Sequence, residues 1–213
     1  SSSIVLEGSD SYVFNPYEYL VGLKNIVKEK IKIYENTRCL NVDKNDNGYV
    51  IVTNNGYKIK CKYCVVATHY PIINVPGYYF LRMHQERSYV VALENAQDLN
   101  GMYKDENKDG YSFRGYKNLL LLGGGDTRTG NNLEKGSYNK LREYARFLYP
   151  GSKEKYNWSA QDCMTSDGLP FIGKYSKEMP NVYVATGFNK WGMTTSMVAS
   201  IIISDNILGK ENM

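Results

Sequence analysis

The chain has 213 residues, of which 42% are hydrophobic and 23% charged, a composition typical of a folded globular protein and not of a disordered or fibrous one. The net charge is only +4, and lysines and arginines are mixed with acids, so we expect no nucleic-acid partner. The longest apolar run, near residues 197–203, is too short to span a bilayer, and no signal peptide opens the chain. We therefore expect a cytoplasmic protein without a transmembrane segment.

The four cysteines give no sign of a metal site. Cys61 and Cys64 form a lone C-x-x-C, with no second pair and no histidine at ligand spacing. The residues around Cys61 alternate between apolar side chains and lysines, which is typical of a β-strand. We expect these thiols to pack in the core and no metal to be bound.

The first third of the chain predicts one helix and several strands. Short strands are expected within residues 4–6 and 12–14, before a helix that Asn15 can cap, with Pro16 at its first position and Glu18 completing a capping box. Apolar residues recur on one face of this helix as far as about residue 30. Strands are then expected at residues 31–35, 39–43 and 49–53, and a short, fully buried one at residues 65–68.

The pattern changes after Pro71. Residues 86–93, 101–103, 111–116 and 119–122 predict an antiparallel meander, followed by an amphipathic helix over residues 138–148. The last third predicts strands at residues 158–165 and 181–186. A helix over residues 194–208 is apolar around most of its circumference, so we expect it to be buried.

A glycine-bounded loop joins the last strand to the last helix. Gly187 and Gly192 flank it, and the helix start aims unpaired N–H groups and a positive dipole end at whatever lies above the loop. Such a site suits an anion or an electron-rich carbonyl. An ordinary strand–helix connection that uses glycine for tight packing is the alternative.

This segment, TGFNKWGMT at residues 186–194, resembles the C-terminal flavin motif of the D-amino-acid oxidase/glycine oxidase superfamily of FAD-dependent oxidoreductases. In that family the loop backbone and helix start face the pyrimidine edge of the isoalloxazine ring, where negative charge develops on reduction. The resemblance implies flavin contacts, mostly through backbone atoms, at Gly187, Phe188, Asn189, Lys190, Trp191, Gly192 and Met193.

Three other segments resemble the family in the expected order. Residues 165–173 are similar to the turn that precedes the flavin loop, and residues 33–39 to a strand whose last position, here Cys39, meets the adenine through its backbone. Residues 65–69, VVATH, resemble a family strand, which implies a cofactor contact at Thr68 and places His69 where glycine is usual. This variant fits best the subset that often carries a Rieske domain.

One departure from the family matters more than these matches. The superfamily begins with a strand, G-x-G-x-x-G and a helix that bind the FAD pyrophosphate, and this sequence contains no such motif. The segment most similar to this motif, at residues 123–130, has Arg128 at the position of the third glycine. The resemblance therefore implies an incomplete FAD-binding domain.

On the substrate side, residues 111–114 resemble a Y-x-x-R strand of the family, which implies that Tyr111 and Arg114 bind a substrate carboxylate. A surface arginine beside a turn is the alternative. His84 could also line the pocket, although a solvated or hydrogen-bonded histidine is commoner than a catalytic base. No catalytic residue is assigned.

Together these features predict an α/β fold, α+β in places. Residues 15–70 and 164–213 are expected to complete the FAD-binding domain, and residues 71–163, with the strands in 1–14, to form an inserted antiparallel-sheet substrate domain. The implied function is part of an enzyme that oxidises a small-molecule amine or amino acid by hydride transfer to FAD. The alternative is a truncated, non-catalytic fragment or a small-ligand module without FAD. The substrate, electron acceptor and oligomeric state are left open.

Overall fold

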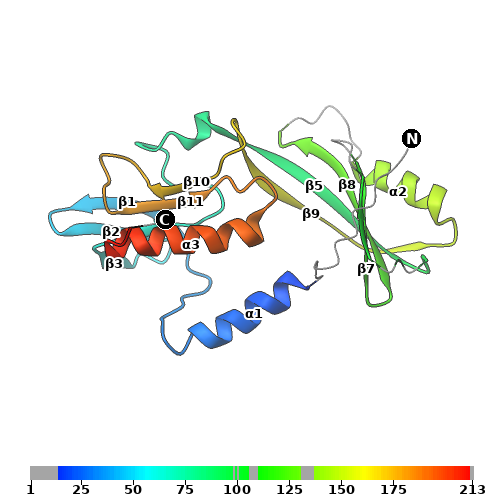
Figure 1. The fold of residues 1–213 in the computed structure, drawn as a ribbon, viewed down its shortest axis with the longest axis horizontal. Helices are drawn as coiled ribbons and strands as arrows, with labels where there is room; N and C mark the ends of the chain where they lie inside the picture. The colour runs from blue at the N-terminus through cyan, green and yellow to red at the C-terminus, as the bar shows by residue number, and fades with distance from the viewer. Residues whose placement is uncertain (1–13, 98, 100, 106–109, 131–136, 212–213) are drawn as a thin grey trace. The chain divides into compact units, whose positions relative to one another are not determined.

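The computed structural model describes residues 14–97, 99, 101–105, 110–130 and 137–211, so the strands expected before Phe14 lie almost wholly outside the described residues. The fold is mixed α/β, as predicted, and the described strands form three sheets (Figure 1). The chain divides into two compact units: unit 1 is Ser1–Phe14 with Gln85–Asp162, and unit 2 is Asn15–His84 with Cys163–Met213. Within the described residues, none of the helices has the length and apolar character needed to cross a membrane.

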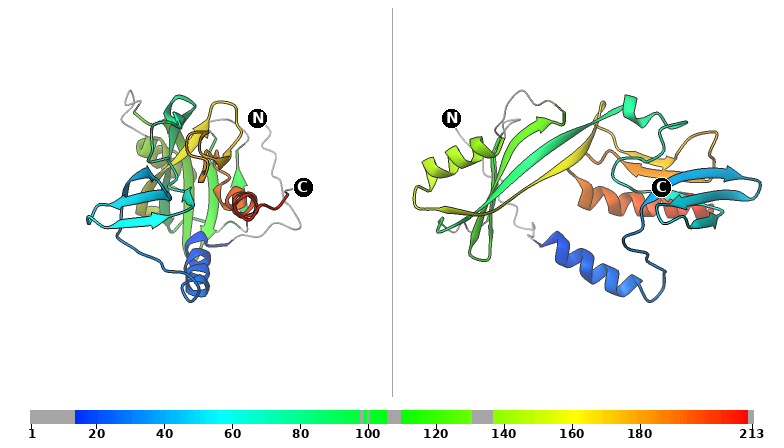
Figure 2. Two further views of the ribbon diagram at one scale, coloured as in Figure 1. Left: turned by 90° about the vertical axis from the view of Figure 1, so that its left-hand side faces the viewer. Right: turned by 180° about the vertical axis from the view of Figure 1, so that it is seen from behind.

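Unit 2 contains two three-stranded sheets. The first is antiparallel, in the order β1 (Cys39–Asn45), β2 (Gly48–Thr53) and β3 (Lys58–Cys61). In the second, β11 (Val182–Thr186) lies between β10 (Phe171–Lys174), to which it is antiparallel, and β4 (Cys64–Val66), to which it is parallel. Helix α3 (Gly192–Leu208) packs against β10 and β11 (Figure 2).

One core cluster holds the two sheets of unit 2 together. It includes Val42 and Tyr49 from the first sheet and Val66, Val182 and Val184 from the second. The 3-10 helix η1 (Tyr79–Leu81) adds Tyr79, whose hydroxyl donates a hydrogen bond to the Tyr175 carbonyl at 3.0 Å. Burial of these apolar side chains is the main stabilising contribution to the unit.

Helix α1 (Pro16–Val27) forms where the sequence predicts it. Asn15 caps it, since Oδ1 accepts hydrogen bonds from Tyr17 N at 3.0 Å and Glu18 N at 3.4 Å. The Asn15 side-chain Nδ2 also donates to Glu18 Oε1 at 3.1 Å, so the side chains of the cap residue and of the glutamate in the first turn are paired. Yet α1 has no buried residue, although it carries several large apolar side chains: Tyr17, Tyr19, Leu20, Val21, Leu23 and Ile26 are all exposed.

Three expectations for unit 2 are wrong, and in each case the structure exposes apolar side chains that the sequence pattern predicts to be covered. Residues 31–35 are not a strand, and Ile31 and Ile33 are exposed. The strand predicted to be fully buried is β4, in which Val65 is 44% exposed. The predicted buried helix α3 buries only Ala199 and Ile203 and exposes Met197, Val198, Ile201 and Leu208.

Unit 1 is built on a five-stranded sheet in the order β6-β7-β8-β5-β9. Its strands are β5 (Met83–Glu94), β6 (Met102–Lys104), β7 (Ser112–Tyr116), β8 (Leu119–Arg128) and β9 (Lys153–Thr165). The expected simple meander is therefore wrong in one respect: β6, β7 and β8 follow one another, but β5 lies beside β8 and not beside β6. Helix α2 (Ser137–Leu148) packs on β8 and buries Leu141 and Ala145 against Leu120 and Leu122.

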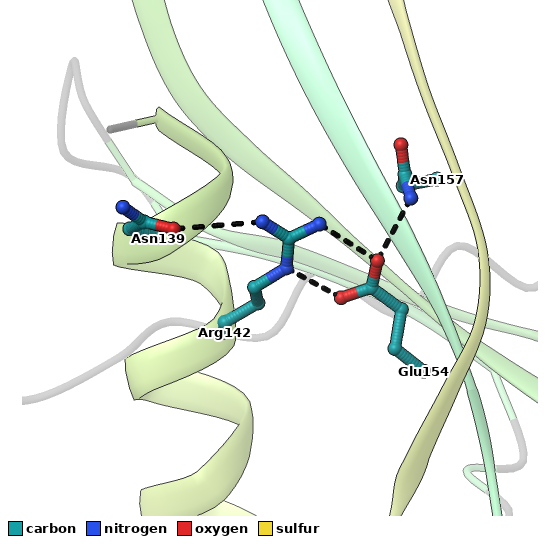
Figure 3. Close-up of polar contacts among 4 residues, drawn as sticks. All are labelled: Asn139, Arg142, Glu154 and Asn157. Atoms are coloured by element: carbon teal, nitrogen blue, oxygen red, sulfur yellow. Dashed lines mark hydrogen bonds and ion pairs between the residues drawn. The ribbon is translucent and has the colours of Figure 1, made fainter. Parts of the chain in front are cut away.

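A polar network ties α2 to β9 (Figure 3). Arg142 binds Glu154 through two hydrogen bonds, Nε to Oε2 at 2.7 Å and Nη2 to Oε1 at 2.9 Å. Asn157 Nδ2 also donates to Glu154 Oε1, at 2.8 Å, and Asn139 Oδ1 accepts from Arg142 Nη1 at 3.5 Å. The hydrogen bonds from Arg142 lower the pKa of Glu154 below its ordinary value, against a smaller opposing effect of burial.

Candidate functional site: the loop before the last helix

The loop between β11 and α3 is tightly wound. Three of its residues have left-handed backbone conformations, with φ of +72° at Gly187, +50° at Asn189 and +73° at Lys190. The Trp191 N–H donates to the Phe188 carbonyl at 2.8 Å and closes the turn. Because non-glycine residues seldom adopt this conformation, surrounding contacts must hold it in place.

The side chain of Asn189 supplies those contacts. Its Oδ1 accepts the Thr165 N–H at 2.9 Å, and its Nδ2 donates to the carbonyls of Gly168 and Gly187, both at 3.0 Å. The Asn189 N–H donates to the Cys163 carbonyl at 3.3 Å. The amide group thus fastens the loop to the turn that follows β9, and Asn189 is a positioning residue whose side chain points into the protein.

The two glycines of the loop have different reasons to be glycine. A Cβ added to Gly187 would lie 2.4 Å from Thr165 Cγ2 and 3.3 Å from Met83 Sδ, so close packing and backbone conformation both require glycine there. A Cβ added to Gly192 would meet nothing within 4 Å. The packing interpretation left open by the sequence is therefore correct for Gly187, whereas Gly192 faces open space.

Among the described residues, the start of α3 carries no side-chain cap. Trp191 is the N-cap residue and makes no side-chain capping hydrogen bond, and its indole is exposed. The first intrahelical bond runs from Thr195 N to the Trp191 carbonyl at 2.9 Å. Helix geometry therefore leaves the N–H groups of Gly192, Met193 and Thr194 without an intrahelical acceptor, at the positive end of a 17-residue helix.

The other residues expected on the cofactor side also lie in unit 2. Cys39 begins β1, is half-buried and directs its thiol to the Asn41 carbonyl at 3.7 Å. Thr68 follows β4, and its hydroxyl donates to the Tyr70 carbonyl at 2.8 Å. Next to it, His69 has a φ of +64°, which explains why glycine suits this position in the related motif. The His69 carbonyl accepts hydrogen bonds from the Thr186 hydroxyl and the Cys163 thiol, which ties the end of β4 to β11 and β9.

Comparison with known proteins identifies the family of this chain. Residues 5–205 match the sequence family DAO, described as FAD dependent oxidoreductase. The chain belongs to this family. A curated relative is the Bacillus subtilis (strain 168) protein YhfW, whose name describes a Rieske 2Fe-2S iron–sulfur protein; it is 34% identical over 218 residues, which cover 99% of this chain and 43% of that protein.

Several solved structures share the fold. Glycine oxidase from Geobacillus kaustophilus matches with a TM-score of 0.68 and 22% identity over 84% of this chain and 50% of that chain. L-proline dehydrogenase from P. horikoshii matches with a TM-score of 0.74 and 21% identity over 92% of this chain and 56% of that chain. This chain thus spans about half the length of the relatives it matches.

Two of the three residues expected on the substrate side, Tyr111 and Arg114, lie in unit 1. Tyr111, just before β7, stacks its ring on Tyr144 of α2, with centroids 4.1 Å apart and planes 19° apart. Arg114 is three residues further along, and an odd spacing in an extended strand puts the two side chains on opposite faces. Arg114 Nη2 donates to the Phe14 carbonyl at 2.7 Å, and its buried Nε has no partner among the described residues. His84, in β5, is half-buried and belongs to unit 2.

Within the part of the chain that the structure describes, no three side chains of the types that bind metals come together. The four cysteines form no disulfide within the described residues: Cys64 and Cys163 are buried, and Cys39 and Cys61 are half-buried. Burial, and to a lesser degree the neighbouring Cys61 and Cys39, raises the pKa of Cys64 to about 11. Cys64 and Cys163 belong to the core of unit 2, and Cys39 and Cys61 pack against it.

Proposed function

We propose that this chain forms part of an FAD-dependent oxidoreductase that oxidises an amine or an amino acid. Membership of the DAO family supports the redox class. In the proposal, unit 2 contributes the loop that holds the flavin ring, and unit 1 contributes the antiparallel sheet on the substrate side. Bound FAD would supply the acceptor for a hydride from the substrate's α carbon.

The observation that carries the proposal is the uncapped start of α3. Gly192, Met193 and Thr194 present N–H groups at the positive helix end, and the space beside Gly192 is open. A flavin carbonyl suits this arrangement because fixed N–H donors stabilise the negative charge that reduction places at the pyrimidine edge. Asn189 holds the loop rigid, so little reorganisation is needed when that charge develops.

Which residues meet the substrate is also part of the proposal. Arg114 carries a guanidinium that suits a carboxylate, and its buried Nε, which has no partner among the described residues, supports this role more strongly than the stacked ring of Tyr111 does. His84 is proposed as a lining residue. The names of structurally similar proteins, which include a glycine oxidase, an L-proline dehydrogenase and an L-amino acid deaminase, suggest small amino acids as the first compounds to test.

Binding of a flavin ring at this loop can be tested with riboflavin, which carries the isoalloxazine ring but not the pyrophosphate. We expect the purified chain to be colourless and to bind added riboflavin weakly, as followed by the perturbation of the visible spectrum. Gly192→Asp should abolish this binding, because a carboxylate at the helix start satisfies the same N–H groups and repels an electron-rich carbonyl. Ser200→Asp adds the same charge two turns further on, where Ser200 is exposed, and should have little effect.

The second candidate is a non-catalytic fragment or a small-ligand module that does not use FAD. The large exposed apolar surface of α1 and α3 favours it for the chain in isolation. A chain that binds neither riboflavin nor FAD, or that binds riboflavin equally well after Gly192→Asp, would support this second candidate. Either result would contradict the proposal that the loop binds a flavin ring.

A further inference from the structure

Arg82 is an exposed residue of unit 2 whose main chain is held on both sides. It follows η1, and its N–H donates to the Tyr79 carbonyl at 2.9 Å. Its own carbonyl accepts two hydrogen bonds from Ser166, one from N and one from Oγ, both at 3.0 Å. These contacts use only the main chain of Arg82, so they fix the start of the side chain and leave the guanidinium available.

The guanidinium of Arg82 lies over two aromatic rings. Its Cζ is 4.2 Å from the centroid of the Phe171 ring and 5.2 Å from the centroid of the Tyr79 ring. The two rings meet edge to face with centroids 5.3 Å apart, and Tyr79 is buried. Such a contact is worth about 0.5–1 kcal/mol at an exposed site, so it favours one position of a side chain that otherwise samples many.

The hydrogen-bond donors of Arg82 are not used by this contact. A guanidinium stacks on a ring through its flat face, while its N–H groups point outward in the plane. Among the described residues, no group accepts a hydrogen bond from this guanidinium and no carboxylate pairs with it. The carboxylate of Asp167, next to Ser166 in sequence, accepts the Leu169 N–H at 3.1 Å. Arg82 therefore presents a positive charge and a set of donors in a restricted orientation.

The guanidinium of Arg82 is close to the loop between β11 and α3. A Cβ placed on Gly187 would be 3.5 Å from Cδ2 of Phe171, the ring over which the guanidinium lies. The same point is 3.3 Å from Sδ of Met83, the next residue along the chain. One aromatic ring thus separates the positive charge from the first residue of the loop. All of these residues belong to unit 2, so the arrangement does not depend on unit 1.

We propose that Arg82 binds the carboxylate of an amino-acid substrate and makes the site prefer amino acids to simple amines. The inference rests on the proposed function, because it places the substrate beside the loop that would hold the flavin ring. A planar fork of N–H donors matches the two oxygens of a carboxylate, and a side chain already held by stacking loses less freedom on binding. Arg114, proposed above for the same group, lies in unit 1 and donates through Nη2 to the Phe14 carbonyl.

The first experiment measures which arginine a carboxylate shields. The purified chain is treated with phenylglyoxal, which modifies guanidinium groups, and the rate at each arginine is followed by peptide mass spectrometry. L-Proline should slow the modification of Arg82 by about threefold or more. Pyrrolidine, which is the same ring without the carboxylate, should have no effect, and inorganic phosphate should have a smaller one. Arg146, exposed on α2 in unit 1, is the control and should react at the same rate throughout.

Two variants test whether the fork and the stacking matter, with L-proline binding measured by ligand-observed NMR. Arg82→Lys keeps the charge but loses the planar fork, and should weaken binding by about tenfold. Because Arg82 is exposed, this variant should unfold at the same temperature as the parent. Phe171→Leu keeps the arginine but removes the ring beneath it, and should weaken binding by about threefold. Arg146→Leu is the matched control and should bind as the parent does.

The outcomes separate this inference from the flavin proposal. Shielding of Arg114 in place of Arg82, shielding of neither, equal shielding by inorganic phosphate, or unchanged binding after Arg82→Lys overturns the inference. If riboflavin still binds in a way that Gly192→Asp abolishes, the proposed function survives that failure. L-Proline that shields Arg82 in a chain that binds no riboflavin supports the carboxylate site and counts against the flavin loop alone.

Discussion

The side-chain amide of Asn189 holds the main chain of Thr165, whose N–H it accepts at 2.9 Å although 24 residues separate the two in sequence. This contact joins the end of β9 to the start of the loop before α3. The loop's left-handed backbone at Asn189 and Lys190 depends on it.

Asn189→Ala should therefore lower the free energy of unfolding by about 1–3 kcal/mol, because the Thr165 N–H and the Gly168 and Gly187 carbonyls lose the amide that pairs with them. Asn206→Ala removes one amide hydrogen bond, to the Ile202 carbonyl at 2.8 Å on exposed α3 surface, and should change stability by less than about 0.5 kcal/mol. Urea denaturation followed by tryptophan fluorescence measures both. Equal effects of the two substitutions would show that Asn189 does not clamp the loop.

The loop's two glycines should respond in opposite ways to alanine. Gly187→Ala should destabilise the protein by about 2 kcal/mol or more, since its Cβ would lie 2.4 Å from Thr165 Cγ2 at a φ of +72°. Gly192→Ala should be neutral or stabilising by up to about 1 kcal/mol, because its Cβ meets open space at a helical position. Thermal unfolding of the pair is the measurement. A Gly187→Ala protein as stable as the parent would contradict the packing described here.

Glu154 should make stability depend on pH. Its pKa in the folded state is lowered, chiefly by hydrogen bonds from Arg142, so its contribution is complete above the unfolded-state value and is lost as pH falls through the folded value. Glu154→Gln should cost about 0.5–1 kcal/mol near neutral pH and nothing in strong acid.

The control for Glu154 is Glu35→Gln, which removes the more exposed ion pair with Lys24. It should have a smaller effect on global unfolding at every pH. Urea midpoints measured from acid to neutral pH compare the two. A Glu154→Gln deficit that persists unchanged in acid would mean that packing, and not charge, links α2 to β9.

Cys64 should be the slowest to react with a thiol reagent among the three cysteines around the first sheet. Its pKa is raised to about 11, mainly by burial, so at pH 8 it carries about a hundredfold less thiolate than a thiol at the reference value of 9.0. Cys39 and Cys61 are half-buried and should react first. Mass spectrometry after timed alkylation identifies the order, and rapid labelling of Cys64 in the folded chain would refute it.

Features set by neighbouring residues could be predicted from the sequence. The cap formed by Asn15 and Glu18 depends on two residues only three positions apart, and the helices and most strands appear where the patterns place them. The loop before α3 was located by its glycines. The role of Asn189 could not be foreseen, because its partners at Thr165 and Gly168 lie far away in sequence; its tolerance of left-handed backbone was the only available signal.

Burial was predicted less well than secondary structure, for a physical reason. Apolar residues in β4, α3 and residues 31–35 show that a surface is suited to being covered, but the sequence pattern does not show how far neighbouring elements cover it. The order of the five-stranded sheet also could not be derived, since the position of β5 beside β8 depends on long-range pairing.

The absence of buried residues in α1 has a consequence for the life of the chain in a cell. A helix that buries no side chain unfolds more easily than one packed in a core, and when it unfolds it exposes an extended apolar segment to chaperones and proteases.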